Sequence, residues 1–208
     1  MLVKKRNLNR VLAFTIMLAL LAVSGDWAQE AKGDAVAVTA TVNSSVTCTS
    51  SGSPAALGVL SSGAIASVFA TTTMGCNSGT GCALSVYDLG NGTNGGLSTT
   101  PAYLIPSPNA AFAVSTTLVA GTEGYGISAV TSSAGSGGVL TLASIYASTT
   151  LGLNGVGGLV TSTLSKQIAS STVAISGREV VVAYKAAISG TTQAGSFSDT
   201  VTYSCVAN

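Results

Sequence analysis

The strongest constraint on the fold is an alternation of side-chain character near the end of the chain. Apart from Asp199, the residues of one parity are apolar (Phe197, Val201, Tyr203 and Cys205), and those between them carry hydroxyls (Ser198, Thr200, Thr202 and Ser204). Successive side chains of a β-strand point to opposite faces of its sheet, so this pattern predicts a strand with one buried face. The segment Glu179–Ile188 alternates in the same way and predicts a second such strand.

Similar patterns predict strands along most of the chain. Val36, Val38, Ala40 and Val42 share a parity that Val46 and Cys48 continue, which predicts a first strand. Further strands are predicted at Ile65–Met74, Cys82–Leu89, Ala102–Ile105, Gly126–Val130, Val139–Ile145 and Gly158–Thr163. Stretches rich in Gly, Asn and Ser, such as Gly90–Gly96, separate them. Many short strands with such turns predict an all-β antiparallel β-sandwich; a β-solenoid is the alternative, without a fixed repeat to support it.

The N-terminus predicts export. Lys4, Lys5, Arg6 and Arg10 precede the apolar run Val11–Val23, which is shorter than the roughly 20 residues that cross a bilayer. We therefore expect a secretory signal peptide at residues 1–25, with an uncleaved anchor as the alternative. A short polar linker at 26–34 and one sandwich domain at 35–208 follow. The mature protein is expected to be secreted, at the cell surface, with no membrane span.

Few charged side chains follow the N-terminal region, which limits the catalytic and metal-binding chemistry open to the chain. From Ala35 onward the ionisable Asp, Glu, Lys and Arg residues are Asp88, Glu123, Lys166, Arg178, Glu179, Lys185 and Asp199, and the chain has no histidine. Acid–base catalysis and metal sites draw on clusters of such groups, so we expect no enzymatic activity, no cofactor and no metal. Without the signal the chain has four basic and seven acidic side chains, a net charge of −3, which argues against nucleic acid as a partner.

Four cysteines in an exported chain predict two disulfides. Cys76 and Cys82 bracket a turn-forming stretch, so a bridge between them is natural and leaves Cys48 to pair with Cys205. Cys48–Cys76 is the runner-up pairing. Cys48 and Cys205 both lie on the apolar parity of their predicted strands, so a bridge between them would join the first strand to the last.

Several segments resemble known families. The run Ala194–Tyr203 resembles the closing strand of spore coat protein U-like and related pilin-like domains. Val86–Gly92, Ala120–Gly126 and Tyr184–Ser189 are similar to segments of a group of secreted bacterial sandwich proteins. The resemblance implies an immunoglobulin-like (pilin-like) β-sandwich and a surface or appendage subunit with no known enzymatic role. The extra cysteine pair departs from pilins assembled by chaperone and usher.

Three polar motifs have competing interpretations. Asp88, Asn91 and Asn94 could ligate calcium, but Asx residues with glycine are also what a tight turn needs, and we favour the turn. The stretch Gly121–Gly126 predicts a bend in which Glu123 pairs locally rather than a phosphate site. Asp199 lies on an apolar parity, so we expect its carboxylate to accept hydrogen bonds from turn amides, with Lys185 or Arg178 as charged alternatives.

These observations favour a structural subunit of a bacterial surface layer, coat or pilus-like fibre, whose partners are copies of itself or other surface proteins. Low charge suits a surface that packs against its own copies. The segment Ala35–Val42 is either an ordinary first strand of its own sheet or a strand that completes a neighbour's sheet, giving a filament. The alternative function is a monomeric adhesin or carbohydrate-binding module whose tyrosines stack on a glycan, although core or rim positions are favoured for those tyrosines.

Overall fold

The computed structural model describes residue 33 and residues 35–99, 103–107, 115–159 and 165–208. The predicted signal peptide and most of the predicted linker lie outside the described residues. The chain divides into two units, Met1–Val42 and Asn43–Asn208. In the first unit the described residues have no regular secondary structure. In the second unit the described elements are β-strands, as expected for an all-β fold.

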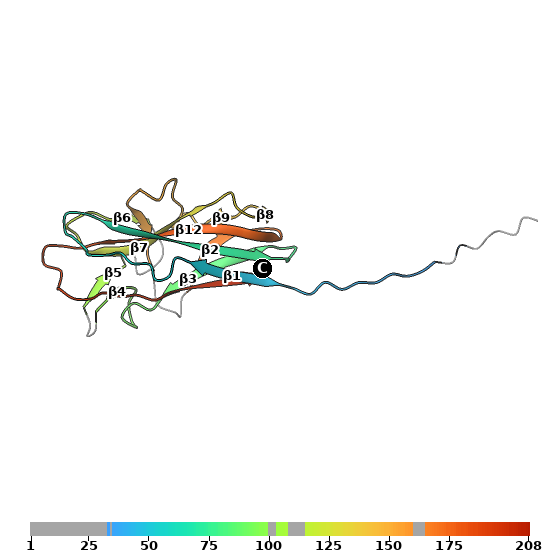
Figure 1. The fold of residues 1–208 in the computed structure, drawn as a ribbon, viewed down its shortest axis with the longest axis horizontal. Coiled ribbons are helices and arrows are strands. Elements are labelled where there is room, and N and C mark those ends of the chain that lie inside the picture. Colours follow the sequence, from blue (N-terminus) through green and yellow to red (C-terminus); the bar gives the residue numbers. More distant parts are fainter. Residues whose placement is uncertain (1–32, 34, 100–102, 108–114, 160–164) are drawn as a thin grey trace, which may run out of the picture. The chain divides into compact units, whose positions relative to one another are not determined.

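The larger sheet has seven antiparallel strands (Figure 1). Its order is β1 (Val46–Ser51), β2 (Ala66–Cys76), β12 (Ile175–Ala187), β7 (Gly124–Thr131), β10 (Gly155–Gly157) and β6 (Ser115–Thr117), and β8 (Ser136–Gly137) pairs with the beginning of β12. The long strand β12 lies between β2 and β7, and its register pairs Val182 with Ala70 on one side and with Ala129 on the other. This central strand holds the sheet together.

The smaller sheet has four antiparallel strands, in the order β13 (Val201–Ala207), β3 (Cys82–Asp88), β11 (Lys166–Ser170) and β9 (Thr141–Leu142). The β13–β3 ladder runs from Val201 opposite Asp88 to Ala207 opposite Cys82. A short pair, β4 (Gly96–Ser98) and β5 (Leu104–Pro106), forms a third sheet. The first and last strands, β1 and β13, lie at the edges of different sheets and are in contact with each other.

The core lies between the two main sheets. Leu84 and Val86 of β3 are fully buried and belong to the same cluster as Met74 of β2 and Val180 and Val182 of β12. These residues fall on one parity of their strands, which is the periodicity that the sequence shows. The antiparallel β-sandwich predicted from that periodicity is therefore the observed architecture.

Several predicted strands differ from the observed ones. The first strand begins at Val46, and residues 35–45 are in no strand, so the prediction of a strand paired within its own sheet at Val36–Val42 is wrong. The predicted strand Val139–Ile145 is reduced to Thr141–Leu142. The predicted strand Gly158–Thr163 falls largely outside the described residues, and β10 ends just before it. The described part of the chain contains no helix long and apolar enough to cross a membrane.

Candidate assembly surface

The segment that the sequence marks as a candidate assembly strand is open to solvent. Val36, Val38 and Val42 are 83, 89 and 85 % exposed, and Ala40 is exposed as well. Isolated exposed apolar residues are common, but an alternating series of them is a strand pattern without a partner strand in the described residues.

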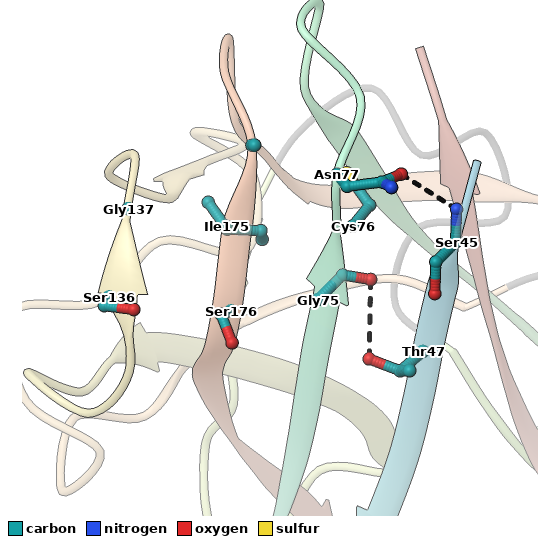
Figure 2. A pocket seen from close by; sticks show the side chains of 10 residues that line it. Ser45, Thr47, Gly75, Cys76, Asn77, Ser136, Gly137, Ile175 and Ser176 are labelled. Carbon is teal, nitrogen blue, oxygen red and sulfur yellow. Dashed lines mark hydrogen bonds between the residues drawn. The ribbon is translucent and has the colours of Figure 1, made fainter. Parts of the chain in front are cut away.

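A side chain that the sequence analysis did not single out anchors the chain just after this segment. The Asn77 carboxamide accepts a hydrogen bond from the Ser45 amide (2.8 Å) and donates one to the Asn43 carbonyl (2.7 Å). The backbone amide of Asn77 also donates to the Ser45 carbonyl (3.2 Å). Figure 2 shows the Asn77 side chain directed at Ser45. Residues 43–45 are therefore fixed to the end of β2, and the chain before them lacks such an anchor among the described contacts.

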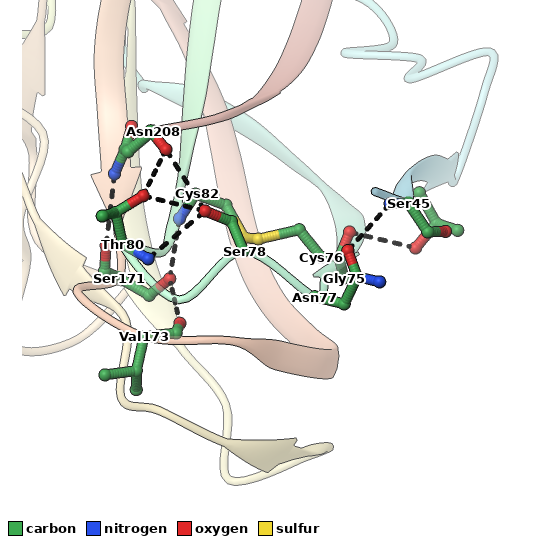
Figure 3. The surroundings of a disulfide bond; sticks show 11 residues. Ser45, Gly75, Cys76, Asn77, Ser78, Thr80, Cys82, Ser171, Val173 and Asn208 are labelled. Atoms are coloured by element: carbon green, nitrogen blue, oxygen red, sulfur yellow. Dashed lines mark hydrogen bonds between the residues drawn. A yellow bond between two sulfur atoms is a disulfide. The ribbon is translucent and has the colours of Figure 1, made fainter. Parts of the chain in front are cut away.

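Two disulfides connect the strands around this anchor. Cys48 of β1 and Cys205 of β13 are bonded, with 5.7 Å between their Cα atoms. Cys76 and Cys82 are bonded across the turn between β2 and β3, with 6.3 Å between their Cα atoms (Figure 3). The first bridge joins the two main sheets at their edges, and the second joins the same sheets through consecutive strands.

The turn closed by Cys76–Cys82 also contacts the last residue of the sequence. The Asn208 amide donates to the Gly81 carbonyl (2.9 Å), and its carboxamide donates to the Ser171 carbonyl (3.3 Å). The Ser78 hydroxyl donates to the Asn208 carbonyl (3.2 Å), as Figure 3 shows. The end of β13 is thereby tied to the turn that follows Asn77.

Both strands joined by Cys48–Cys205 are edge strands. β1 ends the seven-stranded sheet and β13 ends the four-stranded sheet, so each has one side without a partner among the described strands. All six residues of β1 are exposed. An open edge presents unpaired backbone amides and carbonyls, which can accept a strand from another chain. The surface formed by the open edges of β1 and β13 is called the stapled edge below.

A shallow pocket of about 410 Å³ lies next to the anchor (Figure 2). It is lined by small and polar residues: Ser45, Thr47, Gly75, Cys76, Asn77, Ser136, Gly137, Ala174, Ile175 and Ser176. None of these side chains is acidic or basic. The pocket can donate and accept hydrogen bonds through hydroxyls, but its lining supplies no group for acid–base catalysis.

The calcium interpretation of Asp88, Asn91 and Asn94 fails on geometry. Asp88 is fully buried and accepts a hydrogen bond from the Gly96 amide (2.8 Å), whereas Asn91 and Asn94 are exposed. The side-chain oxygen Oδ1 of Asn91 accepts from the backbone amides of Thr93 (3.0 Å) and Asn94 (2.7 Å), which is an Asx turn. Within the described residues no group of three or more His, Cys, Asp or Glu side chains could hold a metal ion.

The other polar residues have local partners. Glu123 accepts hydrogen bonds from the hydroxyls of Tyr103 and Thr192, which ties its bend to two other loops. Asp199 accepts a hydrogen bond from the Gly90 amide (3.0 Å), a turn amide as expected. Lys185 donates to the Leu153 carbonyl, and Arg178 donates to carbonyls including that of Gly138 (2.9 Å).

The tyrosines do not form a stacking platform. Tyr125, Tyr146 and Tyr184 are at most 8 % exposed and belong to the core cluster. The Tyr184 and Tyr203 hydroxyls are 2.6 Å apart and hydrogen-bonded, and the Tyr146 hydroxyl donates to the Gly158 carbonyl (3.0 Å). Trp27 lies outside the described residues. The described aromatic rings therefore stabilise the interior more than they offer a face to a sugar.

Comparisons with known proteins give no relative for this chain: no family model, curated protein or solved structure matches it.

Proposed function

We propose that this chain is an exported, non-enzymatic structural subunit of a bacterial surface layer, coat or pilus-like fibre. Its partners are then copies of itself, and the N-terminal segment of one copy adds as a strand to the stapled edge of the next. The resemblance of Ala194–Tyr203 to pilin-like closing strands is in keeping with this role. Two disulfides suit an oxidising compartment outside the cytoplasm.

The observation that carries the proposal is the exposure of an alternating segment directly before an anchored residue. Val36 and Val38 are more than four-fifths exposed, while Ser45 is held by Asn77. In β-strand addition the backbone of the added segment supplies hydrogen bonds and its alternate side chains supply specificity. Each copy carries both the segment and the open edges, so copies can bind one another in a head-to-tail series, and such a series need not close into a ring.

The scarcity of charge supports the same role. Interface cores are depleted of charged residues, and a monomer with so few surface charges is at risk of association. β1 carries only Val, Thr, Cys and Ser. It lacks the lysines, prolines and inward charges with which solitary proteins protect an edge strand.

The proposal is tested by Val36→Asp together with Val38→Asp in the secreted protein. Unboiled and boiled samples are compared on non-reducing gels, and the same samples are viewed by negative-stain microscopy. We expect a heat-sensitive ladder and filaments for the wild type and a monomer for the double variant. Val59→Asp is the matched control, because Val59 is 99 % exposed in the sandwich domain and lies outside the candidate strand. An unchanged ladder in the double variant would contradict the assembly by this segment.

A monomeric adhesin or carbohydrate-binding module is the second candidate. The hydroxyl-lined pocket beside Asn77 favours it, since sugars are bound through hydroxyls and carboxamides. The test is binding of the monomeric protein to a glycan array, with Ser176→Val and Thr47→Val as pocket variants. Saturable binding that these variants weaken, in a protein that shows no ladder, would replace the structural subunit with the binding module.

A further inference from the structure

Two aspartates share one buried corner at the end of the four-stranded sheet. The β13–β3 register places Val201 directly opposite Asp88. Asp199 lies two residues before Val201 on the same parity, so its side chain faces the same way, one diagonal step from Asp88. Asp88 is fully buried, and Asp199 is half-buried. The two carboxyl groups are therefore neighbours in the interior.

Each carboxyl group caps the same turn with one oxygen and leaves the other without a partner. Asp88 Oδ2 accepts from the Gly96 amide (2.8 Å), and Asp199 Oδ1 accepts from the Gly90 amide (3.0 Å). Asp88 Oδ1 and Asp199 Oδ2 are buried and have no hydrogen-bond partner among the described residues. A buried charged acceptor without a well-placed donor destabilises a fold, so these two oxygens favour protonation of the pair.

The groups that face the pair are tyrosines. Tyr125 of β7 lies beside Asp199, and as a hydrogen-bond donor it lowers the pKa of that carboxyl, although Oδ2 keeps no partner of good geometry. The hydroxyls of Tyr184 (β12) and Tyr203 (β13) are hydrogen-bonded to each other, and burial together with the negative charge of Asp199 raises the pKa of both. Burial and the charge of Asp88 raise the pKa of Tyr146. Lys185 and Arg178, the cations considered from the sequence, donate to backbone carbonyls elsewhere.

We propose that the pair Asp88 and Asp199 takes up one proton from solvent in mild acid, at the unpartnered Oδ1 of Asp88. The charge of the pair changes from −2 to −1, and this buried oxygen is then no longer a charged acceptor without a donor. The pair then acts as an acid-strengthened clamp between the turn at residues 90–96 and the last strand. Burial raises the pKa of Asp88 to about 6, and repulsion from Asp199 adds to the shift. Burial also raises the pKa of Asp199.

The sign of the pH dependence follows from these directions. A carboxyl group whose pKa is higher in the folded state binds its proton more tightly there, so its contribution to stability is complete below pH 3.8 and is lost as the pH rises to about 6. For Asp88 this is about a 100-fold change in the unfolding equilibrium constant. We therefore expect the domain to be more stable at pH 4.5 than at pH 7.5, which is opposite to ordinary acid denaturation.

The decisive variant is Asp88→Asn. The asparagine oxygen can accept from the Gly96 amide, as Asp88 Oδ2 does, while its neutral NH₂ group replaces the buried charge, which imitates the protonated Asp88. We expect this variant to be more stable than the wild type at pH 7.5 and to lose most of the pH dependence between pH 4.5 and pH 7.5. Asp199→Asn should behave alike for the same reason.

Glu179→Gln is the matched control, because it removes a carboxylate of β12 that bonds to the Ser132 hydroxyl and not to the pair. It should keep the wild-type pH dependence. A ¹³C NMR titration of the aspartate carboxyl carbons in the wild type needs no variant to fold, and we expect one proton uptake near pH 6. Ordinary titration of both aspartates near pH 4 would overturn the proposal. So would a stabilisation by millimolar CaCl₂ at pH 7.5 that Asp88→Asn abolishes, because a cation would then fill the corner.

Discussion

Cys48 and Cys205 join the two edge strands β1 and β13 across 157 residues of sequence. The bond links the first and last strands of the sandwich domain covalently, a few residues after the N-terminal segment ends. A strand exchanged between copies would pull on this point, so a covalent link here can carry load that hydrogen bonds alone would not.

The two disulfides should differ in what they contribute to stability. On the chain-entropy model, closing the long Cys48–Cys205 loop contributes up to ~5 kcal/mol and closing the six-residue Cys76–Cys82 loop roughly 2 kcal/mol. We expect Cys48→Ala with Cys205→Ala to lower the free energy of unfolding more than Cys76→Ala with Cys82→Ala. Urea denaturation of both double variants measures this, and the reverse order would show that packing of the buried Cys76–Cys82 bridge outweighs loop entropy.

Gly95 is required by a close approach of two segments. A Cβ atom at this position would lie 2.1 Å from the Leu159 carbonyl oxygen and 3.0 Å from Asp88 Oδ1. Backbone cannot yield as a flexible side chain can, so we expect Gly95→Ala to lower the free energy of unfolding by roughly 1–3 kcal/mol. Gly79→Ala is the control, since a Cβ there meets nothing within 4 Å. Equal stability of the two variants in thermal unfolding would refute the close approach.

The Asn77 anchor should be measurable at one amide. Asn77→Ala removes the acceptor of the Ser45 amide and the donor to the Asn43 carbonyl, each worth about 1 kcal/mol or less at an exposed site. We expect hydrogen exchange at the Ser45 amide to accelerate several-fold, while the amides of β12 stay protected. Asn94→Ala, at an exposed asparagine of another turn, should leave the Ser45 amide unchanged. Unchanged exchange in Asn77→Ala would mean that the anchor lies elsewhere.

Lys185 is a buried cation that gains little from its charge. It is 2 % exposed, its ammonium group donates to the Leu153 carbonyl, and burial lowers its pKa. Because the folded state binds the proton less tightly than the unfolded state, stability rises with pH from the folded pKa up to 10.5. We expect Lys185→Met to stabilise the domain at pH 7 by on the order of 1 kcal/mol and to reduce that alkaline rise. A loss of stability at pH 7 would show that the hydrogen bond to Leu153 outweighs the burial of charge.

The sequence predicted the sandwich where alternation and burial coincide. Val180, Val182 and Tyr184 fall on one parity and all enter the core, and Val201 and Tyr203 pack against it. Strand β11 was missed because it begins with Lys166 and Gln167, which carry no apolar alternation.

Other features depend on contacts between residues far apart in the sequence, which a local side-chain pattern does not reveal. Alternation at Val36–Val42 indicates a segment suited to a strand, but it does not say whether a partner strand is present, and the described structure has none there. The role of Asn77 was also missed, because its partners are 32 and 34 residues away. An asparagine directly after a strand-ending cysteine was the one local hint. The pairing of Asp88 with Asp199 depends on the β13–β3 register, which the sequence alone does not determine.

The most direct test of the proposed assembly is hydrogen exchange at the backbone amides of residues 36–42, compared between polymerised and monomeric fractions of the secreted protein. We predict that these amides exchange freely in the monomer and that alternate ones become protected in the polymer, because every second N–H of the added strand then donates to an edge strand of a neighbouring copy. Equal, unprotected exchange in both fractions would contradict assembly through this segment.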